Sequence, residues 1–351
     1  MRLGFKQRAD HGHQFMIDEN AKDVREDQYM RGAAGRAEMF EAERTRLTSA
    51  AYRMLGSWAE AEDAVQEAWL RFAQADLDGI REPAAWLTTV VARICLDVLR
   101  SARVRREAYV GPWLPEPLVA RLPAADVDPA DAVVGTENLS VALMVVLERL
   151  TPEQRVAFVL HDVFAVGFGE IAAALGTSPG AARQLASRAR RAVAGEPSDR
   201  RRRRSDIAEQ QRVVTAFLAA AQSGDLDGLL AVLAPDVVIV GDGGGIGPAG
   251  RHPIHGALPT ARFVLGLFRR AQAEMDIDLE SVLVNGDLGL LIEAQMRDGL
   301  PIPTPAGVEI GNTLRFVMSF EMIDGRITGI FDQLNPQKLT RVPHLADLRR
   351  P

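Results

Sequence analysis

Residues 168–193 read FGEIAAALGTSPGAARQLASRARRAV, and they carry the pattern of two short helices joined by a tight turn. The first helix is expected over 170–175 and stops at Gly176. Ser178 can cap the second helix, and Pro179 suits its first position, where a backbone N–H has no helical partner. Two helices joined by a glycine-containing turn form a helix-turn-helix. The alternative is an ordinary helical hairpin with a solvated basic face.

The second helix of this motif has an apolar face and a polar face. At helical spacing the apolar side chains expected to be buried are Ala182, Leu185, Ala189 and Val193. The side chains left outside are Arg183, Gln184, Ser187, Arg188 and Arg191. A recognition helix needs this arrangement, because its first half meets base edges and its arginines reach phosphates or guanines.

Length and composition indicate a globular protein of two or three domains. The chain has 351 residues, 47% of them hydrophobic and 25% charged, with a net charge of −6. The basic residues are clustered, with one group over 93–106 and another over 183–204. Local basic stripes on an acidic protein favour local contact with DNA and a separate acidic docking surface.

Cysteine usage and hydropathy suggest a cellular location. Cys95 is the only cysteine, which excludes disulfides within the chain and any cysteine-cluster metal site. No apolar run reaches the roughly 18 residues of a membrane span, and residues 1–10 contain no hydrophobic signal core. We therefore expect a soluble cytoplasmic protein.

Shifts in composition divide the chain into seven segments. Helical patterns resume after each polar or proline-rich stretch, and a run of arginines precedes a change to β-rich sequence. The expected segments are a disordered extension 1–37, a helical domain 38–106, a linker 107–136, a second helical domain 137–194, a basic linker 195–204, an α+β domain 205–334 and a tail 335–351.

The α+β domain is expected to contain a curved antiparallel sheet. Two helices, about 206–222 and 225–233, come first. Alternating segments predict strands over 236–240, 276–284, 287–297, 309–323 and 325–332. Asn285-Gly286 and Asp324-Gly325 are hairpin-turn dipeptides.

The helix expected over 58–72 has an unusual outer face. Its inner side chains are Trp58, Ala61, Val65, Trp69 and Phe72. The opposite face carries Asp63, Gln66, Glu67 and Leu70. An exposed leucine ringed by acids and an amide suits docking of a basic partner helix, although a solvated face with one stray leucine is the alternative.

Three motifs in order resemble the sigma-70 family. Residues 61–70, AEDAVQEAWL, are similar to its region 2.2, and 86–100 are similar to regions 2.3 and 2.4 of the small extracytoplasmic-function (ECF) sigma factors. Residues 151–193 resemble region 4. The resemblance implies a multidomain protein with two all-α sigma domains, a region 2 helical bundle and a region 4 helix-turn-helix.

The resemblance also implies partners and roles for single residues. The region 2.2 face, Asp63, Gln66, Glu67 and Leu70, would bind the β′ coiled coil of core RNA polymerase, and region 4 would meet the β flap. The residues implied in reading the −10 element are Arg93, Arg100, Arg103, Arg105 and Arg106. Those implied in reading the −35 element are Arg183, Gln184, Ser187, Arg188 and Arg191. Trp86 is expected in the core rather than stacked on a base.

The α+β domain resembles a SnoaL-like cone of the NTF2-like superfamily, on the strength of residues 219–225 and 233–237. Sigma factors with this appendage, the sigma-J type, share three short signatures, which would make interdomain regulatory contacts. Here they are Trp113, Leu114, Pro115, Glu116 and Pro117; Asp242, Gly243, Gly244 and Gly245; and Asn335, Pro336, Lys338 and Leu339. Ile246 and Gln337 replace a usual lysine and aspartate, which puts charge-dependent contacts there in doubt. The domain would act as a built-in regulator, with no separate anti-sigma protein.

The expected function is that of an alternative sigma factor, not an enzyme, with no cofactor, metal or membrane contact. One rival is a one-component helix-turn-helix regulator with a ligand-binding cone, and another is a SnoaL-like isomerase or hydrolase fused to a DNA-binding domain. A small-molecule ligand in the cone fits any of the three. Residues that could serve an enzyme are Asp236, Asp242, His252, His255 and Asp332.

Overall fold

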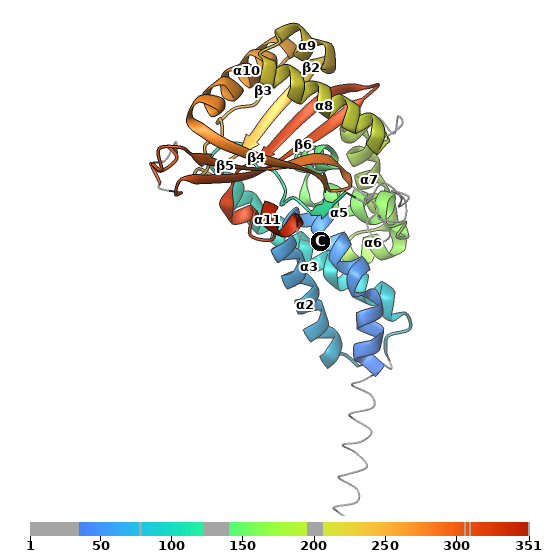
Figure 1. Ribbon diagram of the computed structural model, residues 1–351. Coiled ribbons are helices and arrows are strands. Elements are labelled where there is room, and N and C mark those ends of the chain that lie inside the picture. The colour runs from blue at the N-terminus through green and yellow to red at the C-terminus, as the bar shows by residue number, and fades with distance from the viewer. Residues whose placement is uncertain are drawn as a thin grey trace, which may run out of the picture.

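The computed structural model describes residues 35–76, 79–107, 109–122, 140–194, 206–304, 307–308 and 310–349, with the backbone alone for 102–107 and 194. Three layers are stacked in Figure 1: helices of the C-terminal domain, a mixed β-sheet, and the helices of the N-terminal half. The basic linker 195–204 and nearly all of the extension 1–37 lie outside the described residues. In the described part, no helix is long and apolar enough to span a membrane.

Helices form the N-terminal half. After a helix over 35–55 come α2 (Trp58–Gln74), α3 (Pro83–Glu107), α4 (Val141–Leu147), α5 (Pro152–Phe158), a π-helical turn (Val159–Val163), α6 (Phe168–Leu175) and α7 (Pro179–Ala194). We call 35–107 the first helical domain and 140–194 the second.

The turn between α6 and α7 has the expected chemistry. Gly176 ends α6 in the left-handed conformation with φ of 63°, and the Ser178 hydroxyl accepts a hydrogen bond from the Ala181 N–H. The helix-turn-helix prediction is therefore confirmed. Its inner face differs in one position, since Ala186 is buried where Leu185 was expected, and Leu185 is only half-buried. A small side chain there lets α7 lie close to α5 and α6.

The two helical domains share one hydrophobic core. Leu87 and Cys95 of α3 and Val156 of α5 belong to the same buried cluster, and α3 packs on both α5 and α6. Arg155 of α5 is buried in this region and forms an ion pair with Glu148. Burial lowers the pKa of the Arg155 guanidinium to about 9. The helical domains are thus packed on each other as one unit.

The sheet has seven strands in the order β1-β4-β5-β6-β7-β2-β3. Their bounds are β1 Val119–Arg121, β2 Leu233–Asp242, β3 Ile254–His255, β4 Met275–Val284, β5 Asp287–Met296, β6 Thr313–Ile323 and β7 Arg326–Gln333. Asn285 and Asp324, each before a glycine, take positive φ angles of 52° and 50° in the turns. Hairpins connect β4–β5 and β6–β7.

Two features of the sheet differ from the antiparallel sheet expected from the sequence. β2 and β7 pair in parallel, so the sheet is mixed. Between them the described chain makes four other strands and a helix, a crossover that local sequence patterns do not reveal. β1 comes from the linker and pairs with β4. A segment that precedes the second helical domain in the chain therefore completes the sheet of the C-terminal domain.

Opposite faces of the sheet meet different partners. Helices α8 (Ile207–Ser223), α9 (Leu226–Val232) and α10 (Ala257–Glu274) cover one face, as Figure 1 shows. No helix was expected over α10, since Gly256, Pro259 and Gly266 interrupt its pattern. Yet Pro259 lies in the first turn, where its missing N–H is harmless. The other face packs on the linker, α4 and the C-terminal segment, which contains a 3-10 turn (Pro336–Lys338) and α11 (Leu345–Leu348).

Candidate functional site

A buried carboxylate joins the linker to the C-terminal domain. The Asp242 side chain has no solvent exposure, at the end of β2. Its Oδ1 accepts hydrogen bonds from the Tyr109 hydroxyl at 2.6 Å and the Gly244 N–H at 3.0 Å. Its Oδ2 accepts one from the Leu114 N–H at 2.8 Å. A linker segment 109–116 is therefore fixed by a charge buried in another domain.

Lys338 of the tail supplies the opposite charge. Its Nζ lies 2.7 Å from Asp242 Oδ2 and also donates to the Leu114 carbonyl at 2.6 Å. The ammonium sits 4.0 Å from the centre of the Trp113 ring, within the range of a cation–π contact. With its side chain 11% exposed, this pair is largely removed from solvent. Such a pair is stable only with good geometry and further hydrogen bonds, and both are present here.

Two amides complete the arrangement. The Gln333 Nε2 donates to the carbonyls of Leu114 at 3.3 Å and Pro115 at 3.2 Å. Asn335 Nδ2 donates to the Tyr109 hydroxyl at 2.9 Å. A Cβ on Gly244 would come within 2.3 Å of the Asn335 amide, so this close approach needs glycine. We call the set Tyr109, Leu114, Asp242, Gln333, Asn335 and Lys338 the linker clamp.

The same linker segment is attached to the first helical domain. The Glu116 carboxylate accepts hydrogen bonds from the Ser57 hydroxyl at 2.7 Å and the Trp58 N–H at 2.8 Å, at the N-terminus of α2. An acid there also suits the helix dipole. The Trp113 ring lies against Gly56, where a Cβ would come within 2.5 Å of it. The linker thus connects the N-terminus of α2 to the linker clamp through the side chains of Trp113 and Glu116.

All three signature segments predicted from the sequence therefore meet at one place. Of the two departures from the usual pattern, Gln337 is exposed and outside the clamp. Ile246 is half-buried beside the loop, and the ammonium that pairs with Asp242 comes from Lys338. The charge-dependent contact is consequently complete without either position.

Sequence reasoning missed several residues of this site. Tyr109 and Gln333 belong to no signature, and nothing in the sequence singles out Gly56 as a contact of the linker. Asn285, expected only in a hairpin turn, donates to the Tyr52 hydroxyl at 2.8 Å and bonds the linker at Leu118. No local pattern signals contacts between residues more than 200 positions apart. The sequence signal that could have indicated this site is a polar side chain at the end of an apolar strand, such as Gln333.

The predicted polymerase-binding face lies on the outside of α2. Asp63, Gln66 and Leu70 are exposed, Leu70 by 49%, and Glu67 is half-buried and pairs with Arg71. Next to this face, Glu62 forms an ion pair of 2.8 Å with Arg341 from the tail. The guanidinium of Arg341 also lies over the Trp58 ring, 5.6 Å from its centre. The tail therefore reaches the edge of the face.

Two of the predicted −10 arginines, Arg93 and Arg100, are bonded to other parts of the protein. Arg93 Nη2 donates to the Ala173 carbonyl at 2.7 Å, and Arg100 Nη2 lies 2.9 Å from Glu153 Oε1. Both partners belong to the second helical domain. Trp86 packs on Phe72 with ring centres 5.7 Å apart, in the core as expected. The side chains of Arg103, Arg105 and Arg106 lie outside the described part.

The predicted −35 helix, α7, presents its polar face to solvent. Arg183, Gln184, Arg188 and Arg191 are exposed, and Ser187 is half-buried. Arg183 lies over the Phe168 ring at 5.1 Å. The polar face of α7 is therefore exposed, whereas Arg93 and Arg100 on α3 are bonded to the second helical domain.

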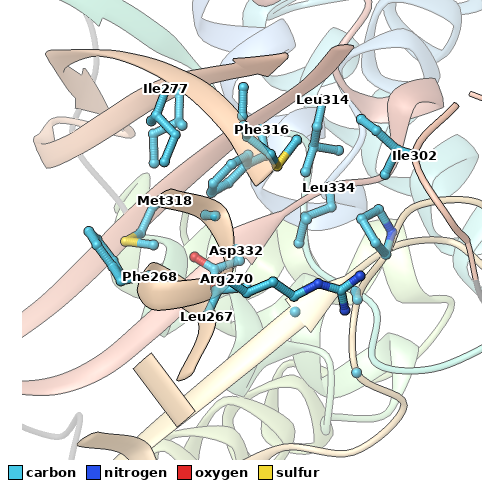
Figure 2. A pocket seen from close by; sticks show the side chains of 18 of the residues that line it. Leu267, Phe268, Arg270, Ile277, Ile302, Leu314, Phe316, Met318, Asp332 and Leu334 are labelled. Carbon is cyan, nitrogen blue, oxygen red and sulfur yellow. The ribbon is translucent and has the colours of Figure 1, made fainter. Parts of the chain in front are cut away.

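The residues considered for an enzyme do not form one group. Asp236 and His255 are exposed, and Asp242 belongs to the clamp. His252 and Asp332 line a cavity of about 300 Å³ between α10 and the sheet (Figure 2). Burial raises the pKa of Asp332 to about 7, and its Oδ1 has no hydrogen-bond partner in the described part of the chain. Among the described side chains, no cluster of three or more His, Cys, Asp or Glu could hold a metal.

Comparison with known proteins covers most of the chain. The Sigma-70 region 2 family matches residues 39–105, the Sigma-70, region 4 family matches 140–193, and the SnoaL-like domain family matches 214–330.

Among curated relatives, the ECF RNA polymerase sigma factor SigJ of Mycobacterium tuberculosis is 47% identical over 309 residues, which cover 87% of this chain and 93% of SigJ. The probable ECF RNA polymerase sigma factor SigI of the same species is 40% identical over 203 residues, which cover 56% of this chain and 67% of SigI. The crystal structure of SigJ aligns with a TM-score of 0.65 at 42% identity and covers 87% of this chain and 98% of that one.

Proposed function

This chain belongs to the ECF RNA polymerase sigma factors, and we propose that its SnoaL-like domain holds it in a closed form that cannot read a promoter. Sigma factors bind RNA polymerase core and promoter DNA. The first helical domain is region 2, and the second is region 4.

The observation that carries the proposal is the contact between the two DNA-reading domains. Arg93 and Arg100, proposed to read the −10 element, bond to region 4. α3 and α7 both pack on α5. Packed helix axes lie about 8–10 Å apart, so these two helices approach within about 20 Å. Promoter elements at −10 and −35 are separated by about 25 base pairs, or about 85 Å of B-DNA. Region 2 and region 4 must separate before both elements are read.

The linker clamp explains how the SnoaL-like domain opposes that separation. Residues 109–116 lead from α3 and are fixed to the C-terminal domain by Asp242 and Lys338, and to α2 by Glu116. A tethered domain acts at high effective concentration, so modest contacts suffice. We propose that core polymerase binds Asp63, Gln66, Glu67 and Leu70 through its β′ coiled coil, meets region 4 through its β flap, and releases the clamp.

Other parts of the proposal follow from this role. The chain carries out no catalysis of its own and works where RNA polymerase works, in the cytoplasm. The proposed −35 contacts are Arg183, Gln184, Ser187, Arg188 and Arg191, all on α7. That a separate anti-sigma protein is not required stays a prediction.

Run-off transcription tests the proposal at matched saturation of core polymerase. The full chain is compared with Lys338→Met, with a chain that ends at residue 204, and with Arg349→Met as the control. Arg349 is also in the tail, but its ion pair with Asp278 is exposed and outside the clamp. We expect more transcript from the first two variants and no change in the control. Equal output from all four proteins would refute a regulatory role for the domain.

A further inference from the structure

We propose that the cavity between α10 and the sheet binds a neutral, ring-containing small molecule with a carbonyl oxygen that meets Asp332. This site is additional to the sigma function, and its test uses neither polymerase nor DNA. The cavity has a volume of about 300 Å³, at the lower end of the range for small-molecule sites.

The walls of the cavity favour an apolar ligand. Aromatic and aliphatic side chains make up most of the lining, and among its described residues only His252, Arg270, Glu274 and Asp332 are titratable or charged. Phe263, Leu267 and Ile277 line it while exposed by 41%, 44% and 39%. Large apolar side chains gathered in one exposed place usually mark a binding surface. An apolar ligand would cover them.

Asp332 is the polar group aimed into this space. It lies on β7, where alternate residues face opposite sides of the sheet, and Gln333 next to it points to the linker clamp. Figure 2 shows its carboxyl group among Phe268, Met318 and Leu334. It is 7% exposed, and its Oδ1 has no hydrogen-bond partner among the residues that the structure describes. A buried carboxyl group with an unpartnered oxygen is costly, so a ligand that forms a hydrogen bond with this carboxyl group contributes to affinity.

The charges around Asp332 decide between ligand classes. Arg270 pairs with Glu274 at 3.0 Å, and its guanidinium lies apart from the Asp332 carboxyl in Figure 2. No cation of the described residues contributes to its titration, and burial raises the pKa of Asp332 to about 7, so the protonated acid is well populated at neutral pH. A protonated carboxyl donates to a carbonyl oxygen without burying a charge, whereas an amine ligand would require two buried ions.

Prodan, a neutral naphthyl ketone whose fluorescence responds to apolar surroundings, is a suitable probe. About nine-tenths of Asp332 is protonated at pH 6 and about one-tenth at pH 8, so the dissociation constant should rise about tenfold between them. Asp332→Asn keeps an N–H donor at every pH and should bind equally at both. The control Asp236→Asn changes an exposed acid outside the cavity and should respond like the wild type.

Two further variants make the test decisive. Histidine is titratable near neutral pH, so His252→Gln must keep the tenfold response if Asp332 causes it. Ala271→Trp places a large ring in the cavity and should abolish binding even if Asp332→Asn fails to fold. Absence of saturable prodan binding to the wild type overturns the proposal. Loss of the tenfold pH response of prodan binding in His252→Gln also overturns it. A third contrary result is that naphthylmethylamine binds more tightly than prodan and that its binding strengthens from pH 6 to pH 8.

Discussion

Replacing Lys338 by methionine should release the linker from the SnoaL-like domain. Methionine keeps most of the side-chain volume but removes the ammonium that lies 2.7 Å from Asp242. The carboxylate is fully buried and would lose its counter-charge. Removing one partner of a buried pair costs about 3–5 kcal/mol. We take about 3 kcal/mol, because Asp242 keeps its hydrogen bonds from Tyr109, Leu114 and Gly244.

Hydrogen exchange measures this release at the affected amides. The Leu114 N–H donates to Asp242, and the Glu116 N–H donates to the Gly56 carbonyl at 2.9 Å. A loss of about 3 kcal/mol corresponds to more than a hundredfold greater population of the released form. Exchange at Leu114 should therefore accelerate by about two orders of magnitude.

The control is Arg349→Met, which removes an exposed ion pair in the same tail. Its effect on Leu114 should be negligible, because exposed pairs contribute little. Leu114 exchange within about threefold of the wild type in Lys338→Met would refute the role of the clamp, since threefold is well under 1 kcal/mol.

Three further predictions concern other parts of the molecule. Asp63→Arg with Glu67→Arg reverses two charges on the outer face of α2 and should abolish co-purification with core polymerase while circular dichroism stays unchanged; retained binding would contradict the docking face. Arg183→Ala and Arg188→Ala should each cost about 1–3 kcal/mol of promoter affinity and relax one −35 position, and unchanged discrimination among promoter variants would rule out base contacts. Burial raises the pKa of Asp332 to about 7, so the native state keeps a proton that the unfolded chain releases near pH 4. Stability should thus fall by on the order of 4 kcal/mol as pH rises from 4 to 8. In thermal melts, Asp332→Asn should lose this dependence of stability on pH. A variant with the same pH profile as the wild type would contradict the assignment to Asp332.

Local sequence patterns predicted the elements that depend on local chemistry. The turn at Gly176 and the cap at Ser178 follow from residue types that favour one backbone conformation. The strands were found because alternate residues face the two sides of the sheet. The position of the β4–β5 hairpin was predicted because Asn285, before a glycine, readily takes the positive φ angle that the turn requires.

The features that the sequence did not reveal depend on long-range contacts. β1 is a strand only because β4 offers a free edge, and α10 is a helix despite Gly266 because Ala261 and Val264 are buried against the sheet domain. The signature residues were identified by resemblance, but the charge balance at Asp242 and the parts played by Tyr109 and Gln333 needed the structure. Closure of region 2 on region 4 is likewise a matter of tertiary packing.

The distance between region 2 and region 4 tests the closed form most directly. Spin labels at Asp97→Cys on α3 and Ala192→Cys on α7 occupy exposed positions, and Cys95 is buried with its thiol pKa raised, which protects it from labelling. Pulsed electron resonance should give one short distance in the free protein. With core polymerase and promoter DNA, that distance should increase by several tens of ångströms. An unchanged distance in a transcribing complex would contradict closure, as would a long distance in the free protein.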